Sequence, residues 1–295
     1  SKTHTIINIH KRKWPTCIGT CACYKGTAFE YIGDLPKHFE KWAPHKKFVS
    51  AHVAKRYPVN WKVAQEAFME AFHVIATHPQ ILAGTGDCNS QYDVFGNFSR
   101  AITPNGTPSP HLPWSPTEQE IFDAITDKRL DEDSMAHVPE GITARAFAAK
   151  VARDRLRPAV PDVDEYCDAE VNDSMYFTLF PNFHPWGAFN RINYRFRPVG
   201  TKVDECLMEC IYTEDFEGDD RPPPAEYIEL GIDQEWTELI PVIGNLARVF
   251  QQDSFNLPKV QKGLETFKAD GLTLTKYQEV KIRHWHAMAE RFIAN

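Results

Sequence analysis

The chain has 295 residues, of which 42% are apolar and 25% are charged, so it can bury a core in one large domain or two small ones. Its formal charge of −7 gives no electrostatic footprint for nucleic acid or an anionic membrane, and we expect neither as a partner. No stretch approaches the roughly 18 to 20 apolar residues of a membrane span. The polar start SKTHTIINIHKRKW lacks the apolar core of a signal peptide, so we expect a cytoplasmic location.

Residues 1–28 are the least regular part of the sequence. A short strand is predicted at 4–9, and Cys17, Cys21 and Cys23 follow it. Their spacing matches neither the paired cysteines of a zinc site nor the Cys-x-His and Cys-x-x-His pairs of a Rieske cluster. The chain has seven cysteines, an odd number, and no secretory signal, so a disulfide framework is not expected either. We predict that this segment is an irregular N-terminal remnant without a bound metal.

Several segments after residue 28 are predicted to be strands. In residues 189–198, FNRINYRFRP, the apolar residues Ile192, Tyr194 and Phe196 alternate with polar ones, as is typical of a strand with one face on the core. A turn with proline and glycine leads to 205–216, so the two segments are predicted to form an antiparallel hairpin. Further strands are predicted at 47–59, 90–104 and 174–182.

Helices are predicted between and after these strands. Ser115-Pro116-Thr117-Glu118 matches a capping box with proline at the first helical position, so a helix is expected to begin there. Others are predicted over about 143–156, from about Asp233 to Gly263, and over about 275–293. We therefore predict one α+β domain over 29–295, in which helices flank an antiparallel sheet.

The stretch 60–79, NWKVAQEAFMEAFHVIATHP, carries the most chemistry. Glu70 and His73 are three residues apart, so they share one face of a helix. His73 and His78 are five apart, and an unbroken helix would rotate them by roughly 140° from each other. The β-branched residues and the proline after His78 favour an end to the helix. A break near 75–77 is predicted to let both imidazoles converge on one ion.

Two histidines and one carboxylate form the facial triad that holds iron(II) and leaves coordination positions open for chemistry. The best third ligand is Asp253, in a predicted helix where Phe250 and Leu257 give that face an apolar character. A buried carboxylate needs a partner, and an ion is a good one. The alternative is that His73 and His78 are interior side chains whose hydrogen bonds are satisfied without a metal.

The pattern NWK…E-x-F-x-E-x-x-H-x4-H-P, with FQQDSFNLPKVQKGL later in the chain, resembles the catalytic domain of the large subunit of Rieske-type aromatic-ring-hydroxylating oxygenases. The resemblance extends from about Phe29 to the C-terminus and includes GDLPKHFEKW, SQYDVFGNFSR, LFPNFHPWG and YQEVKIRHWH. It implies a helix-grip (START-like) fold, in which a curved antiparallel sheet wraps around a long helix with additional surface helices. It also implies a homotrimer.

By this resemblance His73, His78 and Asp253 are the ligands of a mononuclear iron(II). Glu70 matches the acidic position that links His73 to the cluster of a neighbouring subunit, as a bridge for electron transfer. The implied reaction uses O2 to hydroxylate an aromatic or other hydrophobic substrate, giving a cis-dihydrodiol or a monohydroxylated product.

The electrons of this reaction are implied to come from a two-iron, two-sulfur Rieske cluster, and a reductase or ferredoxin is the implied electron donor. The cluster's Cys-x-His and Cys-x-x-His ligands are not in this sequence. We therefore expect either a catalytic-domain fragment or a chain whose upstream part has been lost or altered. Such a chain cannot supply electrons to its own iron site.

The substrate pocket is harder to predict. Phe68, Phe72, Asn182 and His184 are candidate lining residues, although aromatic residues at such positions are more often core.

The same fold and side chains are consistent with two other functions. A helix-grip protein that binds a hydrophobic ligand without chemistry needs no metal. A zinc hydrolase uses similar ligands, but the HExxH motif is missing and Glu70 is the only candidate base.

Overall fold

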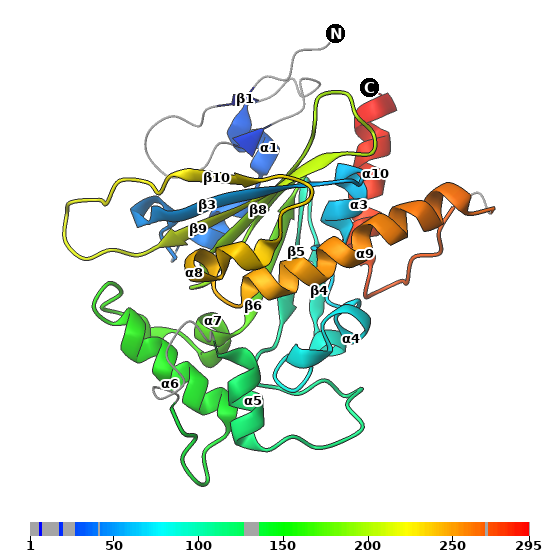
Figure 1. Cartoon of the computed structure of the whole chain (residues 1–295). Helices are drawn as coiled ribbons and strands as arrows, with labels where there is room; N and C mark the ends of the chain where they lie inside the picture. The colour runs from blue at the N-terminus through cyan, green and yellow to red at the C-terminus, as the bar shows by residue number, and fades with distance from the viewer. Residues whose placement is uncertain are drawn as a thin grey trace.

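One large β-sheet organises the chain, and helices pack against it (Figure 1). This computed structural model describes residues 6–7, 18–19, 27–40, 42–126, 136–268 and 271–294. The strands of the sheet are β3 (Phe48–Tyr57), β4 (Gln91–Val94), β5 (Phe98–Thr103), β6 (Ser174–Leu179), β7 (Phe183–Pro185), β8 (Ile192–Pro198), β9 (Cys206–Glu214) and β10 (Tyr227–Leu230). They lie in the order β10-β3-β9-β8-β7-β6-β5-β4. The short strands β1 (Ile6–Ile7) and β2 (Ile18–Gly19) pair with each other, apart from this sheet.

The helices are mostly short, with two longer ones near the C-terminus. They are α1 (Ala28–Ile32), α2 (Leu35–Phe39), α3 (Trp61–Glu66), α4 (Val74–Thr77), α5 (Glu118–Ile125), α6 (Ala144–Leu156), α7 (Asp168–Asn172), α8 (Ile240–Ile243), α9 (Leu246–Thr266) and α10 (Val280–Ala294). The predicted α+β class is confirmed.

The hairpin of β8 and β9 is confirmed, and its register follows from the alternation of the sequence. Tyr194 and Phe196 are buried, because every second residue of a strand points to the same face. The two strands pair antiparallel from Ile192 opposite Tyr212 to Pro198 opposite Cys206. This hairpin lies at the centre of the sheet.

Two apolar clusters divide the core between the long helices. Phe250 and Leu257 of α9 pack with residues of β3, β8 and β9, including Tyr57 and Phe196. Trp285 of α10 belongs to a second cluster with side chains of β5, β6 and β7. At roughly 25 cal/mol per Å² of buried apolar surface, these contacts are the main force that holds α9 against the sheet. The position of Asp253, in the middle of α9, follows from this packing.

Two strand predictions need correction. The edge strand β10 pairs parallel with β3, so the sheet is not wholly antiparallel. The segment 90–104 is a hairpin of β4 and β5, not one strand. It reverses at Phe95, whose backbone N–H donates to the carbonyl of Phe98, and Gly96 lies in this turn.

Three helix boundaries also differ from the predictions. The capping box belongs to Thr117 and Glu120, two residues later than expected, because the Thr117 side chain accepts from the Glu120 backbone N–H. The region after Asp233 is interrupted at Gly244, which has a φ of 66° and separates α8 from α9. Finally, α10 begins at Val280 and not near residue 275.

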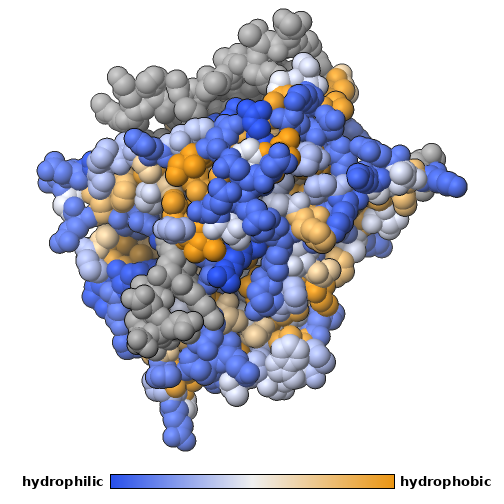
Figure 2. Space-filling view, in the orientation of Figure 1, coloured by the Kyte–Doolittle hydropathy of each residue, from blue (hydrophilic) through white to orange (hydrophobic). Residues whose placement is uncertain are grey.

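The N-terminal cysteines Cys17, Cys21 and Cys23 lie outside the described residues. Among the described helices, none is both long and apolar enough to cross a lipid bilayer. On the face shown in Figure 2, hydrophilic side chains cover most of the surface, and apolar ones form separate groups between them.

Candidate metal centre and adjoining cleft

The stretch 60–79 folds as two short helices joined by an irregular turn. Asn60 caps α3, since its side chain accepts from the Lys62 backbone N–H at 3.0 Å. The helix then stops at Glu66, earlier than the predicted break near 75–77. The backbone N–H of Ala71 donates to the hydroxyl of Tyr92 at 3.0 Å and is no longer available to a helix. This partner comes from β4, so the sequence of the stretch alone does not reveal it.

His73 and His78 flank the single turn of α4, as its N-cap and C-cap residues. His78 has φ −126° and ψ 55°, outside the helical region, as expected for a residue before proline. The two imidazole centroids are therefore only 5.3 Å apart. The predicted convergence of the two histidines is present, although the chain bends at a different place.

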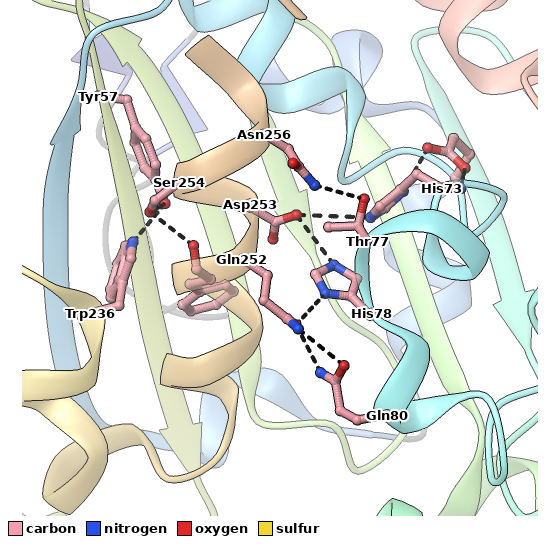
Figure 3. A network of polar contacts seen from close by, with 12 residues as sticks. Tyr57, His73, Thr77, His78, Gln80, Trp236, Gln252, Asp253, Ser254 and Asn256 are labelled. Atoms are coloured by element: carbon pink, nitrogen blue, oxygen red, sulfur yellow. Dashed lines mark hydrogen bonds and ion pairs between the residues drawn. The ribbon is translucent and has the colours of Figure 1, made fainter. Parts of the chain in front are cut away.

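Asp253 reaches the same point from the middle of α9 and is 3% exposed. Its Oδ1 atom lies 3.2 Å from Nε2 of His78 and 4.0 Å from Nε2 of His73. The next residue, Ser254, donates its hydroxyl hydrogen to the buried Tyr57 hydroxyl at 3.1 Å, which ties this part of α9 to β3 (Figure 3).

Glu70 fixes the orientation of His73. The Nδ1–H group of His73 donates to Oε1 of Glu70 at 2.7 Å, and the backbone N–H of His73 donates to Oε2 at 2.9 Å. Burial lowers the pKa of His73, but the hydrogen bond and charge of Glu70 and the charge of Asp253 outweigh burial and raise the pKa above its ordinary value. A hydrogen on Nδ1 leaves the lone pair of Nε2 free to bind a metal.

Gln252 does the same for His78, although it was not among the residues predicted from the sequence. The Nδ1–H group of His78 donates to Oε1 of Gln252 at 2.8 Å, and the same oxygen accepts from Nε2 of Gln80 at 2.8 Å (Figure 3). The one available signal was its place beside Asp253 in the run FQQD.

The chemistry of this donor set fits a cation. Ligand atoms of His73, His78 and Asp253 all lie within 4.8 Å of one another. With both Nδ1 atoms protonated, the three converging atoms are two imidazole lone pairs and a carboxylate oxygen, and none of them brings a hydrogen. Such a buried group of acceptors is costly unless a proton or a metal ion lies between them.

Three of the four predicted pocket residues have packing or hydrogen-bonding roles in the structure, and Phe72 is largely exposed. Phe68 contacts the rings of Tyr194, Phe196 and Phe250, while Phe72 is 41% exposed. Asn182 donates from its side chain to the carbonyl of Phe196 at 2.6 Å, which ties β7 to β8.

His184 is 1% exposed, and its ring nitrogens bond to Thr178 and Gln65. Burial and the charge of Lys281 hold the pKa of His184 well below its ordinary value, so this imidazole is neutral. None of the four predicted residues lines the large cleft near the metal centre.

That cleft has a volume of about 740 Å³ and lies between α5, the start of α9 and the strands β8 and β9. Val249 lines it from α9, one helical turn before Asp253, and Gln80 lines it two residues after His78. Ile192, Tyr212 and Trp114 give it apolar and aromatic walls. A volume in this range is typical of small-molecule sites, so the cleft brings space for a ligand next to the metal centre.

Comparison with known proteins identifies the class. The family model described as ring hydroxylating alpha subunit (catalytic domain) matches residues 39–295, and the chain belongs to this family. The resemblance indicated by the motifs is thereby confirmed. The boundary predicted after residue 28 is not tested by this match and stays a prediction. No curated protein sequence matches the chain.

Solved structures show the same fold at low sequence identity. The quaternary ammonium Rieske monooxygenase CntA in complex with L-carnitine has 12% identity and a TM-score of 0.53, with 95% of this chain and 60% of that chain covered. A naphthalene 1,2-dioxygenase variant bound to phenanthrene has 12% identity and a TM-score of 0.50, with 94% of this chain and 62% of that chain covered. The present chain thus spans about 60% of the length of these neighbours.

Proposed function

We propose that the chain is the catalytic part of a non-haem iron(II) oxygenase that hydroxylates an aromatic or other hydrophobic substrate. The observation that carries this proposal is the convergence of His73, His78 and Asp253 within 4.8 Å, with hydrogen-bond partners that leave lone pairs directed at one point. Two imidazoles and one carboxylate suit iron(II) and leave positions open for O2 and substrate. When bound there, iron supplies the O2 chemistry.

The residues of this chain hold and orient the reacting partners. Glu70 positions His73 and is the group we propose to connect the centre to an electron donor. We propose a Rieske two-iron, two-sulfur cluster as that donor, reached across an interface in a homotrimer and reduced by a ferredoxin or reductase. Membership of the family and the hydrogen bond between Glu70 and His73 support this.

The cleft is the proposed substrate site. Ile192, Tyr212 and Val249 give it apolar or aromatic walls. Gln80 and Val249 line it close in sequence to His78 and Asp253, which would bring a bound molecule near the proposed iron ligands. The apolar walls can contact the ring of a ligand, and Arg191 and Arg248 of the same lining can contact its polar groups. The product is then a cis-dihydrodiol or a monohydroxylated molecule.

Metal analysis tests the proposal. Protein prepared without oxygen and loaded with iron(II) is expected to hold about one iron per chain, bound by the three ligands. His73→Ala is expected to lose most of this iron, whereas His111→Ala, which changes an exposed histidine elsewhere, is expected to retain it. Full iron occupancy in His73→Ala would contradict the proposed ligand set. Tight binding of an aromatic ligand by metal-free protein that never takes up iron would favour a ligand-binding protein without chemistry.

A further inference from the structure

Gln80 and Gln252 form a reciprocal amide pair beside the metal centre. Nε2 of Gln80 donates to Oε1 of Gln252 at 2.8 Å, and Nε2 of Gln252 donates to Oε1 of Gln80 at 3.1 Å. Figure 3 shows the pair below His78, with Gln252 on α9 and Gln80 on the segment after α4. Each side chain is thus held by two hydrogen bonds to the other.

The amide pair determines which nitrogen of His78 carries the hydrogen. A carboxamide has one accepting end and one donating end. Because Gln252 turns its oxygen toward Nδ1 of His78, that nitrogen must donate, and Nε2 is left with a free lone pair facing Asp253. If the amide were reversed, Nδ1 would accept and Nε2 would carry the hydrogen, which would prevent Nε2 from binding a metal.

The pair also reaches the cleft. Gln80 lines the cleft wall, while His78 is only 2% exposed and Gln252 connects the two. A chain of two hydrogen bonds therefore runs from the cleft wall through Gln252 to a metal ligand.

We propose that Gln252 is a positioning residue for His78, that Gln80 holds Gln252 in the orientation required for metal binding, and that the pair links the cleft wall to the metal centre. This inference rests on the proposed function, because it needs His78 to be a metal ligand. Groups hydrogen-bonded to a ligating histidine commonly change metal affinity by about 10- to 100-fold when removed. Gln252 occupies that position here.

Cobalt(II) titration of the full chain tests the proposal, with thermal melting of the metal-free protein as a second readout. Gln252→Leu removes the acceptor and is expected to weaken cobalt binding by about 10- to 100-fold. Gln252→Glu keeps an acceptor for Nδ1–H and adds charge, so it is expected to bind cobalt at least as tightly as the unchanged protein. Gln80→Leu is expected to lie between the unchanged protein and Gln252→Leu.

Gln261→Glu is the matched control. It lies on the same helix and accepts from the Asn60 backbone N–H, away from the metal centre, so cobalt affinity is expected to stay unchanged. Equal affinities of Gln252→Leu and the unchanged protein would overturn the inference while leaving the proposed function intact. Equal weakening by Gln252→Leu and Gln252→Glu, with lowered melting temperatures, would show a merely structural role and also overturn it. Failure of the unchanged protein to bind cobalt would refute the proposed metal centre and, with it, the inference.

Discussion

At the candidate metal centre, one hydrogen bond from each imidazole determines which ring nitrogen is free to bind a metal. His73 and His78 both donate from Nδ1, one to a carboxylate and the other to an amide. The two partners differ in charge, so they hold their histidines with different strength: hydrogen bonds to a charged group contribute about 1.5–3 kcal/mol, and neutral ones about 1. The orientation of His73 is therefore expected to be held more strongly than that of His78.

Glu70→Gln is expected to weaken metal binding by about tenfold or more, because the negative charge on the partner of His73 is lost and the amide NH2 group cannot accept from the His73 backbone. Cobalt(II) titration measures this. Glu66→Gln is the control from the same stretch, since Glu66 bonds to His286 and not to a proposed ligand. Unchanged affinity in Glu70→Gln would show that the carboxylate does not support the centre.

Glu209 gives the chain a pH-dependent contribution to stability. Burial raises its pKa, but hydrogen bonds from His52 and Arg195 and the charges of Arg195 and Arg197 outweigh burial and lower the pKa to about 2. A carboxyl group with a lowered folded-state pKa stabilises the protein above its unfolded pKa of about 4.5, and this contribution is lost as the pH falls toward 2.

Glu209→Gln is therefore expected to reduce the free energy of unfolding by about 3 kcal/mol near neutral pH and by less at about pH 3.5. Urea unfolding at several pH values measures the difference. The exposed Glu217→Gln is expected to change stability by less than about 0.5 kcal/mol throughout. A Glu209→Gln effect that grows on acidification would contradict the assigned sign.

At the scale of elements, α9 carries one ligand and forms a wall of the cleft, so its placement on the sheet controls both. The buried Tyr57 hydroxyl accepts from Nε1 of Trp236 at 2.6 Å and from the hydroxyl of Ser254 at 3.1 Å. Both donors approach from the α9 side of the sheet (Figure 3). This contact holds the part of α9 that carries Asp253 against the sheet.

Tyr57→Phe is expected to lower the free energy of unfolding by about 1–3 kcal/mol, because the buried indole N–H of Trp236 loses its acceptor. The expected loss is visible as a lower urea midpoint, together with weaker cobalt binding from the looser α9. Tyr227→Phe, a half-exposed tyrosine on the edge strand, is the control and is expected to have little effect. Equal stability of the two variants would rule out the anchoring role of Tyr57.

At the scale of the whole molecule, the metal centre and the cleft are built where separate parts of the chain meet. In Figure 1, α5, α6 and α7 lie below the sheet and α9 crosses its face, and residues of α5 and α9 line the cleft together. The proposed metal ligands come from α9 and the segment around α4. None of the three proposed ligands lines the cleft, so a change that fills the cleft is expected to leave the proposed metal site in place.

Val249→Trp is expected to fill part of the cleft and reduce binding of the fluorescent dye anilinonaphthalene sulfonate by about fivefold or more, with unchanged cobalt affinity. Val260→Trp adds the same volume on an exposed part of α9 and is expected to change neither. Loss of cobalt binding in Val249→Trp would show that the cleft cannot be filled without disturbing the proposed metal site.

The sequence by itself determined the class of fold and the central hairpin, since alternating polarity is a local property of the chain. The chemistry of their side chains and the motifs around them singled out the three proposed ligands. It also indicated that Glu70 lies beside His73. The bend after Glu66, the parallel pairing of β10 and the role of Gln252 were decided by the tertiary structure. Each depends on a partner distant in sequence: Tyr92 for the bend, β3 for the edge strand, and His78 for Gln252. Local patterns cannot specify such partners, because they meet only when α9, α4 and the sheet have packed together.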